Sequence, residues 1–314
     1  MDVLPDHFVP PPSEHGRRYT VSHRTAYSYG SEMLDGYSVA HLLARQTPFQ
    51  YVASSVLTTD PDVDERDERV DVFGNHVVQL GVHRPHDHLL VDVSTDVIVE
   101  PATVPETGAS WELVAAQTAA IRGDMALEIS PYLASSRFVP IRKIANEASQ
   151  RDALVAAFGE QFTTGRPIED VIGGVCNFIF EHYRFDPAST TVSTPLGDVL
   201  AQRAGVCQDF AHLAVGAFRA RGIASRYVSG YIETDPPPGE PKTIGADASH
   251  AWCAVWIPEY GWVDLDPTNG IVGPDRHVTI GWGRDYADVA PIRGVVIGPG
   301  SMQTLSVEVD VVRR

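Results

Sequence analysis

The order of the hydrophobic patterns along the chain limits its fold more than any other feature. From residue 18 to about residue 100 the sequence carries short runs of β-branched and aromatic residues, such as YTVSHRTAYSY and LLVDVSTDVIVE, which are typical of strands. Residues 141–222 instead carry apolar residues at the i, i+3, i+4 spacing of amphipathic helices. After Gly222 the strand pattern returns as far as residue 312. This order predicts an all-β module followed by an α+β module, in which helices precede an antiparallel sheet.

The same patterns divide the 314 residues into four segments. The proline-rich start is expected to be loose, and a mixed stretch that contains one helical pattern is expected to connect the two modules. The predicted segments are a flexible tail (1–17), an N-terminal β-sandwich-like domain (18–100), a connector (101–139) and an α+β core (140–314). The core includes the last strand patterns, Gly294–Ile297 and Thr304–Val312, and a Pro/Gly-rich loop at 233–248 that we expect to gate access to a site.

The charge of the chain excludes some partners. Lys and Arg total 24 against 41 Asp and Glu, which gives a formal net charge of -17. Such a surface repels phosphate backbones and anionic lipids, so we expect no nucleic-acid or membrane partner. No run of about 18 apolar residues is present, and the first residues lack the pattern of a secretory signal. The three cysteines are too few for a disulfide framework, and this favours a cytoplasmic location.

Cys207 is the candidate nucleophile. It lies where the turn Gly205-Val206 enters a helical pattern that ends at Gly222. Free N–H groups and the helix dipole at a helix N-terminus stabilise an anion, and both favour the thiolate form of a cysteine. The same N–H groups could donate to an oxyanion. An isolated cysteine at such a position is more often a buried structural residue, so the assignment depends on a partner.

His250 and Asp266 supply that partner. His250 begins the strand pattern SHAWCAVWI, the segment PEYG forms a tight turn, and WVDLD returns. If the turn places Trp252 opposite Asp266, then Asp266 is the diagonal neighbour of His250 on the same sheet face, within reach of its side chain. A register shifted by one residue would separate them. Cys207, His250 and Asp266 would then form a nucleophile, base and orienting carboxylate.

Four separated segments of the chain resemble a known family. The segments AGVCQDFAHL, ASRYVSGYI, SHAWCAVWIPEYGWVDLDPTNG and HVTIGWGRDYADVAPIRGV together resemble the bacterial transglutaminase-like superfamily, whose core is papain-like. The earlier β region, with DVFGN, resembles the N-terminal domain that is often fused to this core. The resemblance spans about residues 18–312. It implies an α+β, papain-like core with an N-terminal β-sandwich-like domain, and a Cys–His–Asp triad at Cys207, His250 and Asp266.

The resemblance leaves the reaction open between three classes. We expect a cofactor-independent cysteine hydrolase, a peptidase or amidase, that cleaves amide or isopeptide bonds of a peptide or protein substrate through a thioester. The first alternative is a transglutaminase-type acyltransferase that forms isopeptide bonds with an amine. Eukaryotic transglutaminases typically carry tryptophan after the nucleophile, whereas this chain has Gln208, which argues against direct protein cross-linking. The second alternative is an inactive binding or scaffold protein.

Three further residues are candidates for the oxyanion site or the substrate groove. Gln208 follows the nucleophile, Tyr183 lies in HYRFDP, and Trp252 shares a strand face with His250. A metal site is not expected. The set Cys207, His250 and Cys253 lacks a C-x-x-C pair, and its last two members point to opposite faces of their strand. A second histidine group, at 83, 86 and 88, is expected to be a polar hairpin tip.

Overall fold

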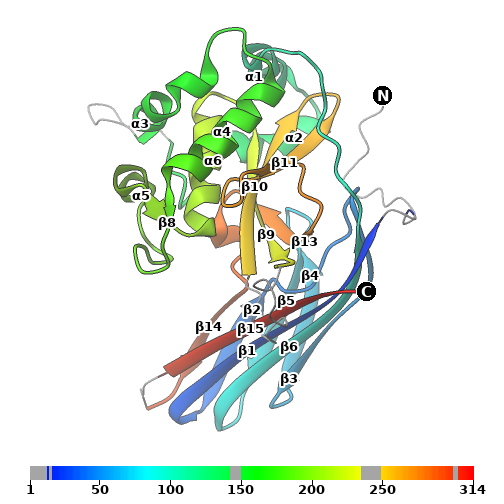
Figure 1. Cartoon of the computed structure of the whole chain (residues 1–314). Helices are drawn as coiled ribbons and strands as arrows, with labels where there is room; N and C mark the ends of the chain where they lie inside the picture. The colour runs from blue at the N-terminus through cyan, green and yellow to red at the C-terminus, as the bar shows by residue number, and fades with distance from the viewer. Residues whose placement is uncertain (1–12, 14–15, 142–149, 235–248, 300–302) are drawn as a thin grey trace, which may run out of the picture.

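The computed structural model describes residue 13 and residues 16–141, 150–234, 249–299 and 303–314. The predicted tail (1–17) lies almost wholly outside the described residues, as do the start of the helical pattern at 141–162 and nearly all of the loop at 233–248. In Figure 1 a strand-rich part lies below. Above it lies a part in which helices cover a separate sheet. The predicted α+β class is confirmed by this arrangement.

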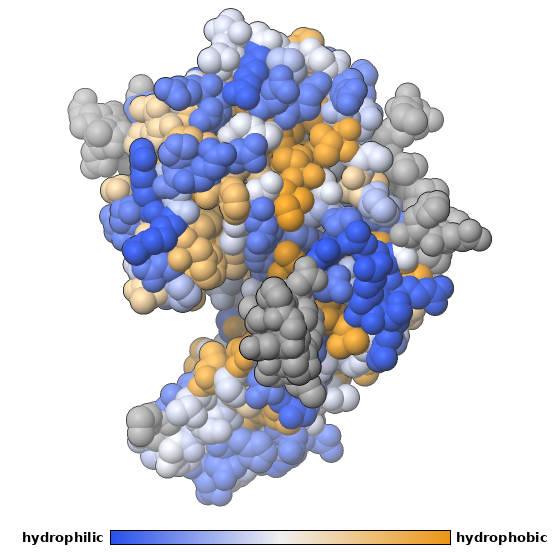
Figure 2. All heavy atoms as spheres, viewed as in Figure 1, coloured by the Kyte–Doolittle hydropathy of each residue, from blue (hydrophilic) through white to orange (hydrophobic). Residues whose placement is uncertain are grey.

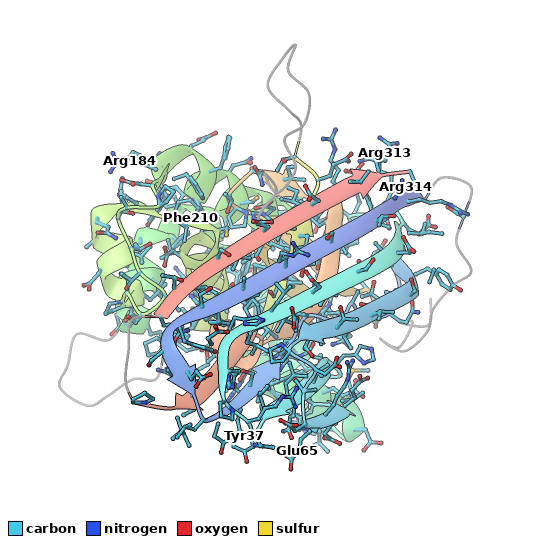
Figure 3. The ribbon with its side chains drawn as sticks, turned by 90° about the horizontal axis from the view of Figure 1, so that it is seen from below. Tyr37, Glu65, Arg184, Phe210, Arg313 and Arg314 are labelled. Carbon is cyan, nitrogen blue, oxygen red and sulfur yellow. The ribbon has the colours of Figure 1, made fainter. Side chains whose placement is uncertain are left out.

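The lower part is a sandwich of two four-stranded antiparallel sheets. Apolar side chains that alternate along the strands, such as Leu57, Leu80 and Val91, are buried between the sheets. Figure 3 shows the strands of the first sheet side by side, and their order is β15-β1-β6-β3. The second sheet has the order β14-β2-β5-β4. The strands are β1 (Arg17–Met33), β2 (Asp35–Ala40), β3 (Gln50–Asp60), β4 (Glu65–Val70), β5 (His76–Val82), β6 (His86–Val99), β14 (Ile292–Ile297) and β15 (Gln303–Arg313).

The last two strands correct the predicted domain boundaries. β14 pairs with β2 and β15 pairs with β1, so both belong to the sandwich and not to a core that extends over 140–314. The C-terminal 11-residue strand runs from Gln303 opposite Tyr29 to Arg313 opposite Tyr19. The strand pattern itself was predicted, but a strand pattern does not say which sheet edge it joins. The chain therefore returns to its N-terminal sandwich after it has built the core.

The upper part is built on a five-stranded antiparallel sheet with the order β12-β11-β10-β9-β13. Its strands are β9 (Ser225–Ile232), β10 (Ser249–Ile257), β11 (Gly261–Asp266), β12 (Ile271–Val272) and β13 (His277–Gly283), and a short parallel pair lies apart at β7 (Arg184–Phe185) and β8 (Ala204–Gly205). The helices are α1 (Trp111–Ala120), α2 (Asp124–Ile129), α3 (Gln150–Ala157), α4 (Ile168–His182), α5 (Leu196–Gln202) and α6 (Cys207–Ala220), with 3-10 turns η1 (Ser130–Leu133), η2 (Gly159–Phe162) and η3 (Tyr286–Asp288).

The two faces of this sheet have different neighbours. Ala251, Cys253 and Val255 of β10 pack against α6 in the larger core, as period-2 alternation predicts. Trp252 and Trp256 face the opposite side, where Tyr132 of η1 and other apolar residues cover them. The predicted connector (101–139) packs on both faces of this sheet. Val114 of α1 belongs to the core on the α6 side, and Ile129 of α2 lies with the tryptophans on the other side. None of the described helices is long and apolar enough to cross a membrane.

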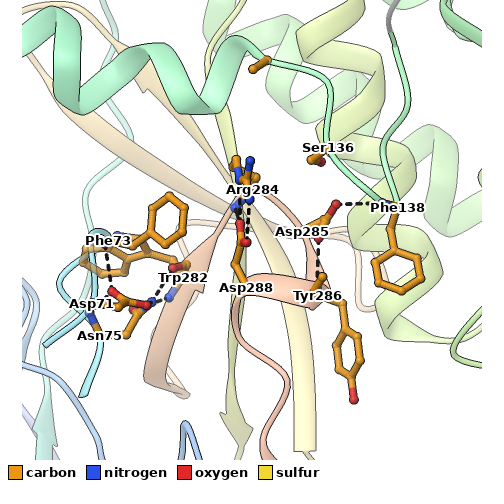
Figure 4. Close-up of polar contacts among 12 residues, drawn as sticks. Asp71, Phe73, Asn75, Ser136, Phe138, Trp282, Arg284, Asp285, Tyr286 and Asp288 are labelled. Atoms are coloured by element: carbon orange, nitrogen blue, oxygen red, sulfur yellow. Dashed lines mark hydrogen bonds and ion pairs between the residues drawn. The ribbon is translucent and has the colours of Figure 1, made fainter. Parts of the chain in front are cut away.

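The turn between β4 and β5 joins the sandwich to the sheet (Figure 4). Asn75 accepts a hydrogen bond from the backbone N–H of Trp282 at 2.9 Å, and its amide donates to the Trp282 carbonyl at 2.8 Å. Asp71 accepts from Asn75 within the turn, and Gly74 takes a positive φ of 80°. The guanidinium of Arg45 donates to Asn75 and lies 3.3 Å from the centroid of the Trp282 ring. These contacts fix the sandwich against the end of β13.

Candidate active site

The structure places Cys207 at the first residue of helix α6. Val206 is the N-cap, with extended backbone angles, and the Asp209 side chain accepts from the Val206 N–H at 2.9 Å and from Thr190 Oγ1 at 2.7 Å. Gly205 is needed here, because a Cβ at this position would lie 2.7 Å from Asp209 Oδ2. The first N–H groups of the helix have no intrahelical acceptor. Cys207 is partly exposed, whereas the other two cysteines are buried.

The pairing of β10 with β11 brings His250 to Asp266. Cys253 pairs with Leu265, and the same register continued by one residue sets Trp252 opposite Asp266. His250 Nε2 lies 2.7 Å from Asp266 Oδ2, so the predicted diagonal contact is present. Cys207 also acts on the His250 ring and contributes to raising the pKa of its imidazole. Because Nε2 faces the carboxylate, Nδ1 is the ring nitrogen left for the thiol.

Asp266 is a completely buried carboxylate with several donors. Its Oδ2 also accepts from His277 Nε2 at 2.8 Å and from Asn269 Nδ2 at 2.6 Å. Its Oδ1 accepts from the backbone N–H of Thr268 at 2.9 Å. Burial alone would raise the pKa of this carboxyl, but the hydrogen bonds from the two histidines hold the pKa of Asp266 well below its usual range. Asp266 therefore stays ionised and fixes the orientation of the His250 ring.

His250 is held in its charged form at neutral pH. Burial alone would lower the pKa of this imidazole, but the hydrogen bonds to Asp266 and Cys207 outweigh it and raise the pKa of His250 to about 10. The stability that this charged pair contributes is complete below the ordinary value of 6.5 and is lost as pH rises through about 10. An imidazolium next to the thiol is the arrangement that stabilises a thiolate.

This pKa gives a direct test of the His250–Asp266 pair. Replacing Asp266 by asparagine removes the negative charge, and we expect the pKa of His250 to fall by at least about one unit from its value of about 10. Titration of the ring by NMR in protein with labelled histidine measures this shift. The exposed Asp67→Asn in β4 removes the same charge far from the ring and serves as the control. An unchanged His250 pKa in Asp266→Asn would contradict the pairing.

His277 and Asn269 were not predicted from the sequence. Asn269 lies in the turn DPTNG, and because Asp and Asn in turns favour local side-chain hydrogen bonds, a local signal for it existed. No local signal existed for His277. Its strand β13 comes to the site only because it pairs with β9 in the folded sheet. The side-chain atoms of His250, Asp266 and His277 that could hold a metal ion lie within 4.8 Å of one another. Separations of 2.7 and 2.8 Å between their nitrogen and oxygen atoms are those of hydrogen bonds, so this group forms a hydrogen-bonded network.

The side chains of the three groove candidates make other contacts. Trp252 is completely buried and its indole N–H donates to Asp264 at 3.0 Å, so its prediction as a groove residue is wrong. Tyr183 is buried in the core, where its ring contacts the ring of Phe210 in α6. It does not line a groove either. The amide of Gln208 donates to the Val192 carbonyl at 3.1 Å, which ties the preceding loop to α6 instead of placing a donor over the thiol.

Sequence comparison identifies the family. The profile of the transglutaminase-like superfamily matches residues 157–267, and that of the bacterial transglutaminase-like N-terminal region matches residues 19–98. The chain is 36% identical over 304 residues to an uncharacterized protein of Mycobacterium tuberculosis, covering 94% of this chain and 92% of that protein. An uncharacterized protein of Mycobacterium leprae is 31% identical over 297 residues, or 94% of this chain and 99% of the relative. The chain therefore belongs to the transglutaminase-like superfamily, as its motifs predicted.

Two other relatives carry functional names. A protein-glutamine gamma-glutamyltransferase of Pseudomonas aeruginosa is 30% identical over 135 residues, which are 41% of this chain and 17% of that protein. A solved structure from Cytophaga hutchinsonii, described as a proposed cysteine protease, superposes with a TM-score of 0.70 at 21% identity and covers 95% of this chain and 91% of its own. The latter likeness establishes the fold. Family and fold together indicate a cysteine-based enzyme.

Proposed function

We propose that the protein is a cofactor-independent cysteine hydrolase that cleaves amide or isopeptide bonds of peptide substrates. The observation that carries this proposal is the imidazole of His250, whose Nε2 lies 2.7 Å from the buried carboxylate of Asp266 and whose pKa responds to Cys207 at the start of α6. A nucleophile, a base and a residue that orients the base would thus act in series. The scissile carbonyl would lie against the thiol of the partly exposed Cys207.

The chemistry follows from these positions. The Cys207 thiolate attacks the carbonyl carbon and forms a C–S bond, while the N–H groups at the start of α6 donate to the oxyanion. His250 gives its proton to the leaving nitrogen, the C–N bond breaks and a thioester remains. Water then attacks the thioester, His250 takes a proton from it, and the C–S bond breaks to release a carboxylic acid and restore the thiolate beside the charged His250. His277 and Asn269 act as positioning residues, since both donate to the Asp266 carboxylate.

Two features favour water as the acceptor. Cys207 is partly exposed, so solvent would reach a thioester formed on it. The surface is hollowed on the left of Figure 2, between the helical part above and the sandwich below, and in Figure 1 the strand β8 that leads into Cys207 lies at this side of the helical part. A peptide in this hollow would be accessible to water. The formal charge of -17 favours neutral or cationic peptides over acidic ones.

An acyltransferase is the second candidate, because the chain matches part of a protein-glutamine gamma-glutamyltransferase. The two reactions share the thioester and differ only in the nucleophile that resolves it. The test incubates the protein with a labelled primary amine and with a glutamine-containing protein or a peptide library as acyl donor. We expect carboxylic acid products in clear excess over amine-labelled products. Mass spectrometry of both pools measures the ratio, with Cys207→Ala as the blank. Predominant labelling would establish the acyltransferase instead.

The cytoplasmic location remains a prediction.

A further inference from the structure

The strand β15 lies at one edge of the first sheet of the sandwich. It pairs with β1 along its length and ends the strand order of the sheet, and Figure 3 shows it as the outermost strand. All six residues from Gln303 to Glu308 are exposed. Among the described residues, the backbone of 303–309 makes no backbone hydrogen bond outside the ladder to β1. This part of the edge is therefore open to a further strand.

The ladder shows which backbone groups of β15 point outward. The N–H of Arg314 donates to the carbonyl of Arg18, and from there the pairing with β1 runs to Gln303 without a shift in register. In an antiparallel pair, every second residue exchanges both of its hydrogen bonds with the residue opposite. Even-numbered residues of β15 therefore face β1. The N–H and C=O groups of Leu305 and Val307 point away from it.

The far edges of the two sandwich sheets are protected against a further strand. In the edge strand β3, the N–H and the carbonyl of Val52 are both bonded by the Gln46 side chain at 2.9 Å. The carbonyl of Leu57 accepts from Arg66 at 2.8 Å. The edge strand β4 has the sequence ERDERV and is almost wholly charged. Bonded edge groups and charged side chains are ways in which natural sheets prevent strand addition.

The edge at β15 is apolar instead, and it borders the hollow beside the helical part. Leu305 and Val307 are 56% and 49% exposed, and Val295 and Ile297 of the edge strand β14 are exposed as well. In Figure 1, β14 and β15 are the sandwich strands below the hollow, and Figure 2 shows apolar residues where the sandwich borders it. Gathered apolar surface of this kind marks a binding surface. It is continuous with the hollow proposed above for the peptide substrate.

We propose that the segment 303–308 of β15 docks an extended segment of the peptide substrate as an additional antiparallel strand. Strand addition supplies main-chain hydrogen bonds for affinity and alternate side-chain positions for specificity. That the docked chain is a substrate rests on the proposed function, whereas the strand addition itself does not. A second copy of this chain fits the edge less well, because two chains that each carry a formal charge of -17 repel each other.

The side chains of β15 define the segment that fits. Residues directly opposite each other in an antiparallel pair face the same side of the sheet. Leu305 and Val307 share one face, so they favour β-branched apolar residues opposite them. Glu308, on the other face, lies opposite Arg24 of β1, whose guanidinium donates to Asp92 at 2.8 Å. A lysine on the added strand would pair with Glu308. The fitting segment is therefore Lys-Val-Thr-Val-Thr, with its lysine opposite Glu308.

Docking is tested by the fluorescence anisotropy of a labelled Gly-Lys-Val-Thr-Val-Thr-Gly peptide with the full chain carrying Cys207→Ala, which prevents turnover. N-methylation of both valines removes the donors to the carbonyls of Leu305 and Val307, and we expect it to weaken binding at least about tenfold. Glu308→Gln should weaken binding about threefold, whereas Glu68→Gln, which removes a charge from the exposed strand β4, should not. Equal binding of both peptides, or no binding at about 1 mM, would overturn the proposal.

Val307→Pro tests the same contact from the side of the protein. Proline removes an N–H that points away from β1, so the ladder to β1 keeps its bonds. We expect Val307→Pro to weaken peptide binding at least about tenfold, and Val307→Thr, which keeps the N–H, to weaken it less. Circular dichroism verifies the fold of both variants. Wild-type binding by Val307→Pro would contradict docking on β15. A sedimenting dimer that Val307→Pro dissociates would assign the edge to a second copy and also overturn the proposal.

The role of the docked segment as substrate is tested by turnover. The substrate found in the peptide library is extended through a flexible Gly/Ser linker by the docking segment or by a scrambled segment. We expect the docking segment to lower KM at least about tenfold with little change in kcat, and Val307→Pro to abolish this gain. Equal KM values for the two substrates, with peptide binding intact, would refute the substrate role. If Cys207→Ala turns over substrate like the wild type, the proposed function fails, and strand addition at β15 is decided by the anisotropy measurements.

Discussion

Replacing Cys207 by alanine is expected to lower turnover at least about 10³-fold and to leave the fold intact. The loss is large because the thiolate forms the bond that every later step requires, and the remaining members of the triad cannot replace it. Cys207 is partly exposed at the end of a helix, so the substitution creates no cavity in the core. The measurement is the steady-state rate on the peptide substrate found in the library, with circular dichroism to verify folding.

The other two cysteines provide matched controls. Cys176 and Cys253 are completely buried, and burial raises the pKa of Cys176 to about 12 and that of Cys253 well above its ordinary value. In the folded protein, iodoacetamide should therefore modify Cys207 and spare both of them. Cys176→Ser preserves a donor toward the Asp266 carbonyl and should retain activity. Equal labelling of the three thiols, or an active Cys207→Ala protein, would rule out Cys207 as the nucleophile.

The proposed triad was accessible from the sequence because each step toward it is local. The Gly205-Val206 turn before a helical pattern places Cys207 at a helix end, and the short PEYG turn restricts the register that sets Asp266 diagonal to His250. The pairing of the C-terminal strands could not be predicted, because it is not local. A strand pattern indicates which face is buried. Whether the strand joins the sandwich or the core sheet depends on free sheet edges whose residues lie more than 200 positions earlier in the sequence.

The same distinction explains the other errors. Alternation correctly put Trp252 on the face of His250, but it could not show that this face is covered by η1 and the sandwich, which bury the ring completely. His277 has no neighbour in sequence that signals a role, and only the order of the strands brings it to Asp266. Residues whose role depends on a packing layer or on strand order are therefore the ones that sequence patterns miss.

Gly230 is expected to be the most sensitive position in the sheet outside the triad. It lies in β9, opposite His250 on one side and Thr279 on the other. A Cβ at this position would lie 2.0 Å from the Val278 carbonyl oxygen and 2.7 Å from the Trp252 ring. The first atom is backbone and the second belongs to a completely buried ring, so neither can move away cheaply.

Gly230→Ala must therefore separate β9 from β13 or displace Trp252. We expect it to lower the free energy of unfolding by about 3 kcal/mol or more, at the upper end of what overpacking costs. The same shift moves His277 away from Asp266, so activity should fall further than the folded fraction does. Gly173→Ala in α4 is the control, because a Cβ at this position would have no neighbour within 4 Å and alanine in a helix is favourable by about 0.5–1 kcal/mol. Urea unfolding of both variants, followed by circular dichroism, measures the difference. A Gly230→Ala protein as stable as Gly173→Ala would show that β9 and β13 do not approach so closely beside His250.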